Sequence, residues 1–172
     1  MFPAQFTLVA STNPCPCGYY GDTIQQCTCS PRQREQYWAK LSGPLMDRID
    51  LQVAVNRLKP EEITQQPTGE ASTSVRQRVQ EARDRASIRF QTEANLRCNA
   101  QMQSSHLQKW CKLDDGSRNL LETAIRKLGL SARASDRILK VARTIADLAA
   151  DEKLKPNHVA EAIQYRTIDR MQ

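Results

Sequence analysis

Residues 6–30 read FTLVASTNPCPCGYYGDTIQQCTCS, and this stretch decides how the first part of the chain is organised. The apolar run at its start predicts a buried strand over residues 5–13 that ends in a polar tip at Asn13. The turn residues and cysteines that follow predict an irregular loop over residues 14–30. Because ligands gather at the C-terminal ends of strands in open α/β sheets, we expect a catalytic edge at this strand tip.

The loop carries four cysteines in two matched pairs. The pairs are Cys15-Pro-Cys17 and Cys27-Thr-Cys29, with nine residues between them. Tetrahedral zinc takes four thiolates, although the usual ligand pair has two to four intervening residues and each pair here has one. The alternatives are four reduced thiols in a tight loop, or two disulfides formed during handling. Zinc is favoured, and it is structural, because four thiolates leave no open coordination position.

The composition is typical of a soluble, helix-rich protein. Of the 172 residues, 40% are hydrophobic and 26% are charged, which suits one ordinary domain or two small ones. No apolar stretch approaches the roughly 20 residues that a membrane span requires, so we predict a cytoplasmic protein without a membrane partner. The net charge of +6 permits contact with nucleic acid, but a solvated Arg-rich surface is the more common explanation of such a charge.

A helix and a second strand are predicted after the cysteine loop. Residues 31–41 have a helical pattern, with Ser30 as the N-terminal cap and Pro31 at the first helical position. Gly43-Pro44 ends this helix, and residues 49–55 alternate like a strand. Two strands cannot make a stable sheet alone, so the N-terminal third is predicted to be the end of a larger α/β domain.

The remainder of the chain is predicted to be helical after a linker. We expect a core portion over residues 1–57, a linker over 58–71 and a helical bundle over 72–172. The predicted helix ends are marked by Gly129, Ser131 and Pro156. The predicted inward-facing residues of the two longest helices are Val75, Val79, Ala82, Ala86 and Phe90, and Ile138, Leu139, Ala142, Ile145, Ala146 and Ala149. The fold class is therefore mostly α with a small β component.

Three polar residues are candidates for chemistry, although each has an ordinary explanation. Asn13 could orient a water or a phosphate oxygen, but Asn-Pro also opens turns. Arg48 lies between two aspartates and could simply be ion-paired at the surface. Arg133 lies in the first turn of a capped helix, where the helix dipole gives a cation no benefit, so a bound anion would explain it. We expect His106 and His158 to be surface residues.

A family resemblance joins these candidates. The residues that carry it are 8–22 (LVASTNPCPCGYYGD), 27–31 (CTCSP), 41–51 (LSGPLMDRIDL), 130–134 (LSARA), 136–148 (DRILKVARTIADL) and 158–166 (HVAEAIQYR). Together they closely resemble the Mg-chelatase-like AAA+ proteins of the ComM/YifB type. The resemblance covers nearly the whole chain, and the paired cysteines distinguish this branch from true chelatase subunits.

The resemblance implies a role for each candidate. Asn13 matches sensor 1, which positions the water that attacks the γ-phosphate of ATP. Arg48 matches the arginine finger that one subunit presents to its neighbour's nucleotide. Arg133 matches the sensor 2 arginine, which contacts the phosphates from the helical lid. The resemblance thus implies ATP and Mg²⁺ as cofactors, a ring that is expected to be a homo-hexamer, and a helicase-like or branch-migration motor acting on DNA in recombination or transformation.

The chain departs from the family in one respect. It contains no Gly-x-x-x-x-Gly-Lys-Ser/Thr motif and no acidic strand end ahead of Phe6, so the phosphate cradle and the magnesium carboxylates are missing. We therefore expect a C-terminal fragment, made of the end of an AAA+ α/β core and a helical lid, that does not hydrolyse ATP alone.

Two alternatives stay open. One is the ATPase subunit of a magnesium-chelatase-type metal-insertion complex. The other is a free-standing, zinc-stabilised binding module without enzymatic activity. The free-standing module predicts a well-ordered N-terminal strand and a buried turn at Arg48, whereas part of an ATPase predicts an exposed strand edge.

Overall fold

The computed structural model describes residues 6–41, 43–58, 63–64 and 69–166. It divides into two compact units, one reaching Leu45 and the other beginning at Met46, and each is described by itself. Parts of three predicted elements lie outside the described residues: Gln5 of the first strand, residues 59–62 and 65–68 of the linker, and residues 167–172 of the lid. The predicted boundaries at residues 57 and 72 stay a prediction.

The first unit consists of the cysteine loop and the helix α1 (Pro31–Trp38). The start of α1 is confirmed: Ser30 and Gln33 form a capping box, in which the Gln33 amide donates to Ser30 Oγ and the Ser30 amide donates to Gln33 Oε1. The helix buries none of its residues. Its position in the unit must therefore come from specific polar contacts rather than from an apolar face.

Those contacts join α1 to the cysteine loop. Trp38 Nε1 donates to the carbonyl of Pro14 over 3.0 Å, and Arg34 donates to the carbonyl of Cys29 over 3.0 Å. The Arg34 guanidinium also lies 4.5 Å from the centre of the Tyr20 ring. The loop and α1 consequently form one small structure.

A short helix, α2 (Gly43–Met46), follows where the sequence predicts a break at Gly43-Pro44. Pro44 is compatible with this new helix because a proline in the first turn loses no intrahelical hydrogen bond. The helix α1 does end before this point, at Trp38.

The structure does not show the predicted small β component, because neither residues 6–13 nor residues 49–55 form a strand. Phe6, Val9 and Val55 are 80%, 90% and 89% exposed, so the first predicted strand is not buried either. An extended segment becomes a strand only when a neighbour pairs with its backbone. Among the described residues no such ladder exists, and the expected edge of an α/β core is not seen.

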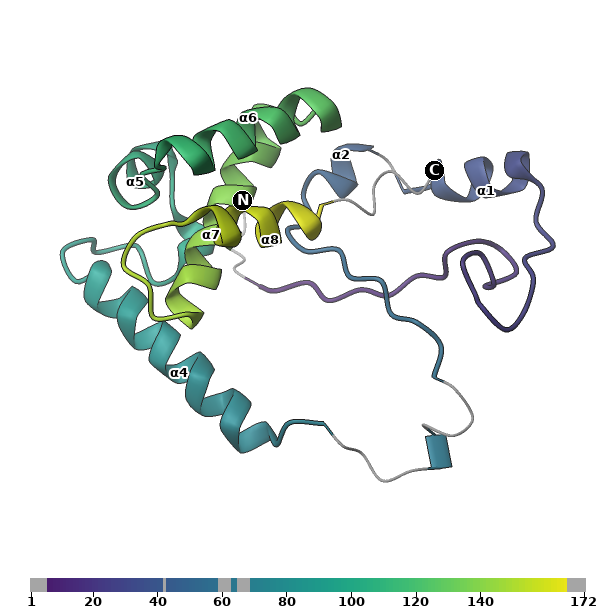
Figure 1. Ribbon diagram of the computed structural model, residues 1–172, viewed down its shortest axis with the longest axis horizontal. Helices are drawn as coiled ribbons and strands as arrows, with labels where there is room; N and C mark the ends of the chain where they lie inside the picture. Colours follow the sequence, from purple (N-terminus) through teal and green to yellow (C-terminus); the bar gives the residue numbers. More distant parts are fainter. Residues whose placement is uncertain (1–5, 42, 59–62, 65–68, 167–172) are drawn as a thin grey trace. The chain divides into compact units, whose positions relative to one another are not determined.

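The second unit is helical and is centred on one helix. Its elements are α4 (Ser72–Arg89), the 3₁₀ helix η1 (Asn99–Gln101), α5 (Ser104–Trp110), α6 (Asp115–Leu128), α7 (Ala132–Leu148) and α8 (Pro156–Gln164). Helix α7 packs against α8, α4, η1 and α5, and α8 packs in turn against α6 (Figure 1). The predicted mostly α character is therefore confirmed.

The core of this unit follows the predicted apolar positions of α7. Ile138, Ala142 and Ala146 are completely buried, while Ala149 is exposed. The helix begins at its predicted cap, since the Ala134 amide donates to Ser131 Oγ.

The joints between the other helices also agree with the sequence. Gly129 ends α6 with a φ of +52°, the left-handed conformation in which glycine meets no Cβ clash, and Pro156 begins α8. These caps were predicted from the sequence and are confirmed.

Helix α4 is buried along only part of its length. Ala82, Ala86 and Phe90 enter the core, but Val75 and Val79 remain 37% and 42% exposed. The predicted stripe therefore faces solvent over the first half of the helix. Among the residues that the structure describes, no helix combines the length and the apolar content that a bilayer crossing requires.

Candidate functional site

The four loop cysteines converge as predicted. Their Sγ atoms all lie within 4.8 Å of one another, with Cys15 Sγ 3.3 Å from Cys17 Sγ and 3.7 Å from Cys27 Sγ. The sulfurs are not bonded to each other, because a disulfide would bring two of them to about 2.05 Å. A tetrahedron of Zn–S bonds of about 2.3 Å has edges of about 3.8 Å, so the cluster fits a zinc ion.

Local backbone geometry brings the two pairs together. The Gly18 amide donates to the carbonyl of Cys15 over 3.0 Å, and Gly18 has a φ of +85° that a residue with a Cβ rarely adopts. The Cys17 amide donates to Cys29 Sγ over 3.4 Å, which links the first pair to the second. The short Cys-x-Cys spacing therefore does not prevent convergence.

The thiols of this cluster differ in acidity. Hydrogen bonding from the Tyr19 amide lowers the pKa of Cys17 to about 5, whereas burial raises the pKa of Cys29 to about 12. Neighbouring thiolates repel one another, so a cation is needed before all four can be ionised. The donor set therefore suits a thiophilic metal ion in a closed, structural site.

The second candidate is the turn that carries Arg48, between α2 and the extended segment after it. The Arg48 side chain is exposed. Arg137 of α7 donates to the Arg48 carbonyl over 2.8 Å and also pairs with the Asp50 carboxylate. The turn is therefore attached to the helical unit.

Arg166, just after α8, holds the same turn. Its side chain is only 1% exposed, and it donates to the carbonyl of Ile49 and lies 3.6 Å from the Asp47 carboxylate. The Gln52 amide donates to the Tyr165 carbonyl over 2.9 Å. Sequence reasoning missed both arginines; the only signal was the pair of aspartates that flank Arg48.

Arg133 is exposed in the first turn of α7, four residues before Arg137. Residues four apart share one face of a helix, so Arg133 lies on the face that reaches the Arg48 turn. The structure thus places Arg48 and Arg133 in one unit, with α7 as the element between them.

Asn13 belongs to the first unit and is exposed at the end of its extended segment. A Cβ placed on Gly18 would lie 3.8 Å from Asn13 Nδ2, so the amide adjoins the turn of the first cysteine pair. Asn13 therefore lies next to the cysteine loop.

A buried ionic network supports the helical unit and was also missed. Asp147, with a side chain 2% exposed, accepts from Arg143 Nε over 3.2 Å, from Asn99 over 2.9 Å and from Arg89 over 2.9 Å. Arg143 also donates to the carbonyl of Glu152 over 2.7 Å. The i, i+4 spacing of Arg143 and Asp147 in the apolar face of α7 was the available signal.

His158 corrects another expectation, because it is 1% exposed rather than at the surface. Its Nδ1 accepts from the Lys155 amide over 3.2 Å, and its Nε2 lies 3.1 Å from the Asp151 carboxylate. The ring therefore serves the start of α8. His106 is partly buried in α5.

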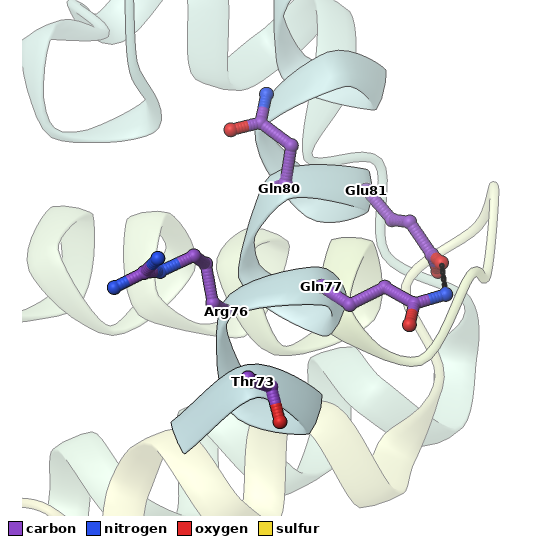
Figure 2. A pocket seen from close by; sticks show the side chains of 5 residues that line it. All are labelled: Thr73, Arg76, Gln77, Gln80 and Glu81. Atoms are coloured by element: carbon purple, nitrogen blue, oxygen red, sulfur yellow. Dashed lines mark hydrogen bonds between the residues drawn. The ribbon is translucent and has the colours of Figure 1, made fainter.

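A shallow hollow on α4 offers no comparable site. It is lined by Thr73, Arg76, Gln77, Gln80 and Glu81, with Gln77 donating to Glu81 over 3.3 Å (Figure 2). All of the lining comes from one helix, so no second element directs polar groups toward a ligand.

Comparison with known proteins places the chain in a family. The model of the magnesium chelatase subunit ChlI C-terminal region matches residues 69–166, and that of magnesium chelatase subunit ChlI matches residues 1–63. The competence protein ComM of Haemophilus influenzae is 42% identical over 172 residues, which are 99% of this chain and 32% of that protein. The uncharacterized protein YifB of Escherichia coli is 40% identical over 171 residues, again 99% of this chain and 32% of that protein.

The chain thus spans about a third of the length of the curated relatives it matches. Helices α4 to α8 lie within residues 69–166, and the Arg48 turn lies within residues 1–63. The chain belongs to the magnesium chelatase subunit ChlI family, in the branch that includes ComM and YifB.

Proposed function

We propose that this chain is part of an ATP-driven ring motor that acts on DNA, in which it supplies the arginine finger and the helical lid. The observation that carries the proposal is the Arg48 turn, in which an exposed arginine lies on a backbone that Arg137 and Arg166 hold from two sides. An arginine that must reach a neighbouring subunit's nucleotide needs both an accessible side chain and a backbone that is held in place.

The chemistry needs positioned positive charge. Phosphoryl transfer spreads negative charge over the γ-phosphate oxygens, and a finger arginine supplied by a neighbour is worth about 10³–10⁵ in rate. In this proposal Arg48 is that finger, Arg133 contacts the phosphates of the subunit's own ATP, and Asn13 orients the attacking water. ATP and Mg²⁺ are the cofactors when the phosphate cradle is present in the same protein.

The ring, its DNA substrate and its location belong to the same proposal. A finger has a use only beside another subunit's nucleotide, so the motor is a ring, and we expect a homo-hexamer in the cytoplasm. The Haemophilus influenzae relative is named a competence protein, and the net charge of +6 suits contact with a polyanion. DNA is accordingly the substrate that we favour.

A second candidate is the ATPase subunit of a magnesium-insertion complex, which the description of the matched family favours. The four-thiol cluster separates the two candidates, because the resemblance to the ComM/YifB type implies that paired cysteines distinguish this branch from true chelatase subunits. The free-standing binding module is less well supported, since it predicts a buried Arg48 turn and an ordered N-terminal strand.

The four thiols hold a structural zinc in this proposal. Sulfur spacings near those of a zinc tetrahedron support it. Protein purified without added metal should contain about one zinc per chain by elemental analysis. A Cys15→Ser, Cys27→Ser variant should contain none, and Cys98→Ser, which alters an exposed cysteine outside the cluster, should keep its zinc.

The finger is tested in a full-length protein in which this chain replaces the matching third of the Haemophilus influenzae relative. Arg48→Ala should lower ATP turnover by about 10³-fold or more. Arg126→Ala, which removes an exposed arginine paired with Glu122 on α6, is the matched control and should leave turnover unchanged. Unchanged turnover in Arg48→Ala would show that the proposed role is wrong.

The substrate is tested with the same graft. Turnover measured with and without duplex, branched and single-stranded DNA should rise with at least one of them. Absence of any stimulation, together with magnesium insertion into a porphyrin when chelatase partners are added, would support the second candidate instead.

A further inference from the structure

Two separate parts of the lid hold the Arg48 turn, and we call this pair of attachments the clamp. On one side is Arg137, one turn into α7, and on the other is Arg166, which follows α8. Each arginine bonds one backbone carbonyl of the turn and pairs with one of its carboxylates. Arg137 donates to the Arg48 carbonyl and pairs with Asp50. Arg166 donates to the Ile49 carbonyl and pairs with Asp47.

The pattern fixes the backbone at the finger itself. The carbonyls of Arg48 and Ile49 are consecutive, so bonding both of them restricts the peptide that immediately follows the Arg48 Cα atom. The Gln52 amide adds a third anchor by donating to the Tyr165 carbonyl over 2.9 Å. The Arg48 side chain, which is exposed, makes no contribution to these three backbone bonds.

The two holding arginines are themselves well placed to be rigid. The Arg166 side chain is 1% exposed and that of Arg137 is 23% exposed. An arginine bonded to carboxylate and carbonyl oxygens at once has its planar head oriented as well as attracted. The turn therefore takes its position from the lid helices.

We propose that Arg137 and Arg166 are positioning residues for the finger, through which the lid sets where Arg48 points in the neighbouring subunit's site. This inference rests on the proposed function. Its physical basis is that a misplacement of about 1 Å in a catalytic group can cost about 10²-fold in rate. Loss of one clamp arginine releases the turn without touching the guanidinium that performs the chemistry.

The arrangement also connects the two nucleotide-directed arginines of one subunit. Arg133 and Arg137 lie four residues apart on α7 and share one of its faces. A contact of Arg133 with bound phosphates and the contact of Arg137 with the turn thus act on the same helical segment. Nucleotide held by one subunit would in this way bias the finger that it offers to the next.

The test is a double-mutant cycle in the full-length graft described above. Arg137→Ala should lower kcat for ATP hydrolysis by about 10- to 100-fold and change KM for ATP little, because the finger acts in the transition state. In the Arg48→Ala background, Arg137→Ala should cause no further loss, since a positioning residue acts only through the group it positions. An equal loss in both backgrounds would overturn the proposal.

Conservative variants separate positioning from general stability. Arg137→Lys keeps the positive charge but loses the planar guanidinium, so it should recover only part of the lost turnover. Arg166 is buried, so its side of the clamp is tested with Asp47→Asn, which removes the charge pair and leaves the Ile49 carbonyl bond in place. Asp47→Asn should lower kcat less than Arg137→Ala does, and Arg126→Ala should have no effect.

The outcomes distinguish this inference from the function on which it rests. If Arg48→Ala is itself neutral, the finger role is wrong and the positioning role falls with it. If Arg48→Ala is damaging while Arg137→Ala is neutral, only the positioning role is overturned. Loss in Arg137→Ala that depends on the presence of Arg48 supports both.

Discussion

Different interactions stabilise the two units of this chain, a thiol cluster in the first and an apolar core in the second. In the first unit, Cys15 is the one buried side chain among residues 6–41, and it belongs to the thiol cluster. In the second, Ile138, Ala142 and Ala146 line up along α7 as a completely buried apolar face. A segment too small to bury an apolar core depends on cross-links or metals, whereas a helical bundle does not.

The contrast extends to what each unit leaves exposed. The first unit exposes large apolar side chains such as Phe6 and Val9, at 80% and 90%. Burial of such side chains is worth roughly 1.5–3 kcal/mol each, and the first unit forgoes it. Among the described residues of this unit, the thiol cluster is therefore the expected source of stability.

Removal of metal should have the largest effect and should be confined to the first unit. Structural zinc contributes about 10–16 kcal/mol of apparent binding free energy in small peptides, so chelation should unfold the cysteine loop. Hydrogen exchange should show lost protection at the amides of Cys17 and Gly18, both hydrogen-bonded within the loop. Amides of α7 should keep their protection.

Loss of hydrogen-exchange protection in α7 on chelation would contradict this difference between the units, because their stabilities would then be coupled. The Cys98→Ser variant serves as the control, since this cysteine is exposed and lies in the helical unit. It should respond to the chelator as the unsubstituted chain does.

Substitution of the buried carboxylate should have the next largest effect, in the second unit alone. Asp147→Asn keeps the shape of the side chain but leaves the guanidinium of Arg143, itself 2% exposed, without its charge partner. Breaking a buried ion pair from one side costs about 3–5 kcal/mol. Urea unfolding followed by far-UV circular dichroism should show this loss, with zinc content unchanged.

A helix cap in the second unit should give the smallest effect and a pH signature. The Asp114 carboxylate accepts from the Ser117 amide over 2.7 Å, and this bond lowers the pKa of Asp114 below its ordinary 3.8. The stabilisation is thus present above pH 3.8 and is lost as the pH falls through the lowered pKa. Asp114→Ala should lower the free energy of unfolding at neutral pH, by less than Asp147→Asn does.

The paired control is Asp114→Asn, which can still cap α6 through its amide oxygen. It should keep most of the stability at neutral pH but lose the contribution of this site to the pH dependence. An Asn variant that titrates like the original chain would assign that dependence to another carboxyl group.

The helical unit was largely predictable because its signals are local. Ser131, Gly129 and Pro156 mark helix ends through backbone geometry that depends only on neighbouring residues. The apolar spacing of α7 likewise predicted which of its faces is buried. The polar residues within that face, Arg143 and Asp147, were not predicted because their burial depends on partners from α4 and η1.

The strands and the clamp were not predictable in the same way. Residues 6–13 and 49–55 have the alternation or the apolar content of strands, but a strand also requires a neighbour that no local pattern supplies. The convergence of the cysteines was predicted from spacing, and Gly18 explains how one-residue gaps permit it. The attachment of the Arg48 turn to Arg166 joins residues more than a hundred positions apart and leaves no periodic trace.

The clamp has a consequence for protein engineering within this family. Along the sequence, the Arg48 turn precedes the linker at residues 58–71, so a designer who exchanges lids between relatives would naturally cut in that linker. Such a chimera would pair one protein's turn with another protein's arginines and separate contacts that here arise from Arg137 and Arg166. The interchangeable module begins before the turn, at Met46, where the helical unit itself begins.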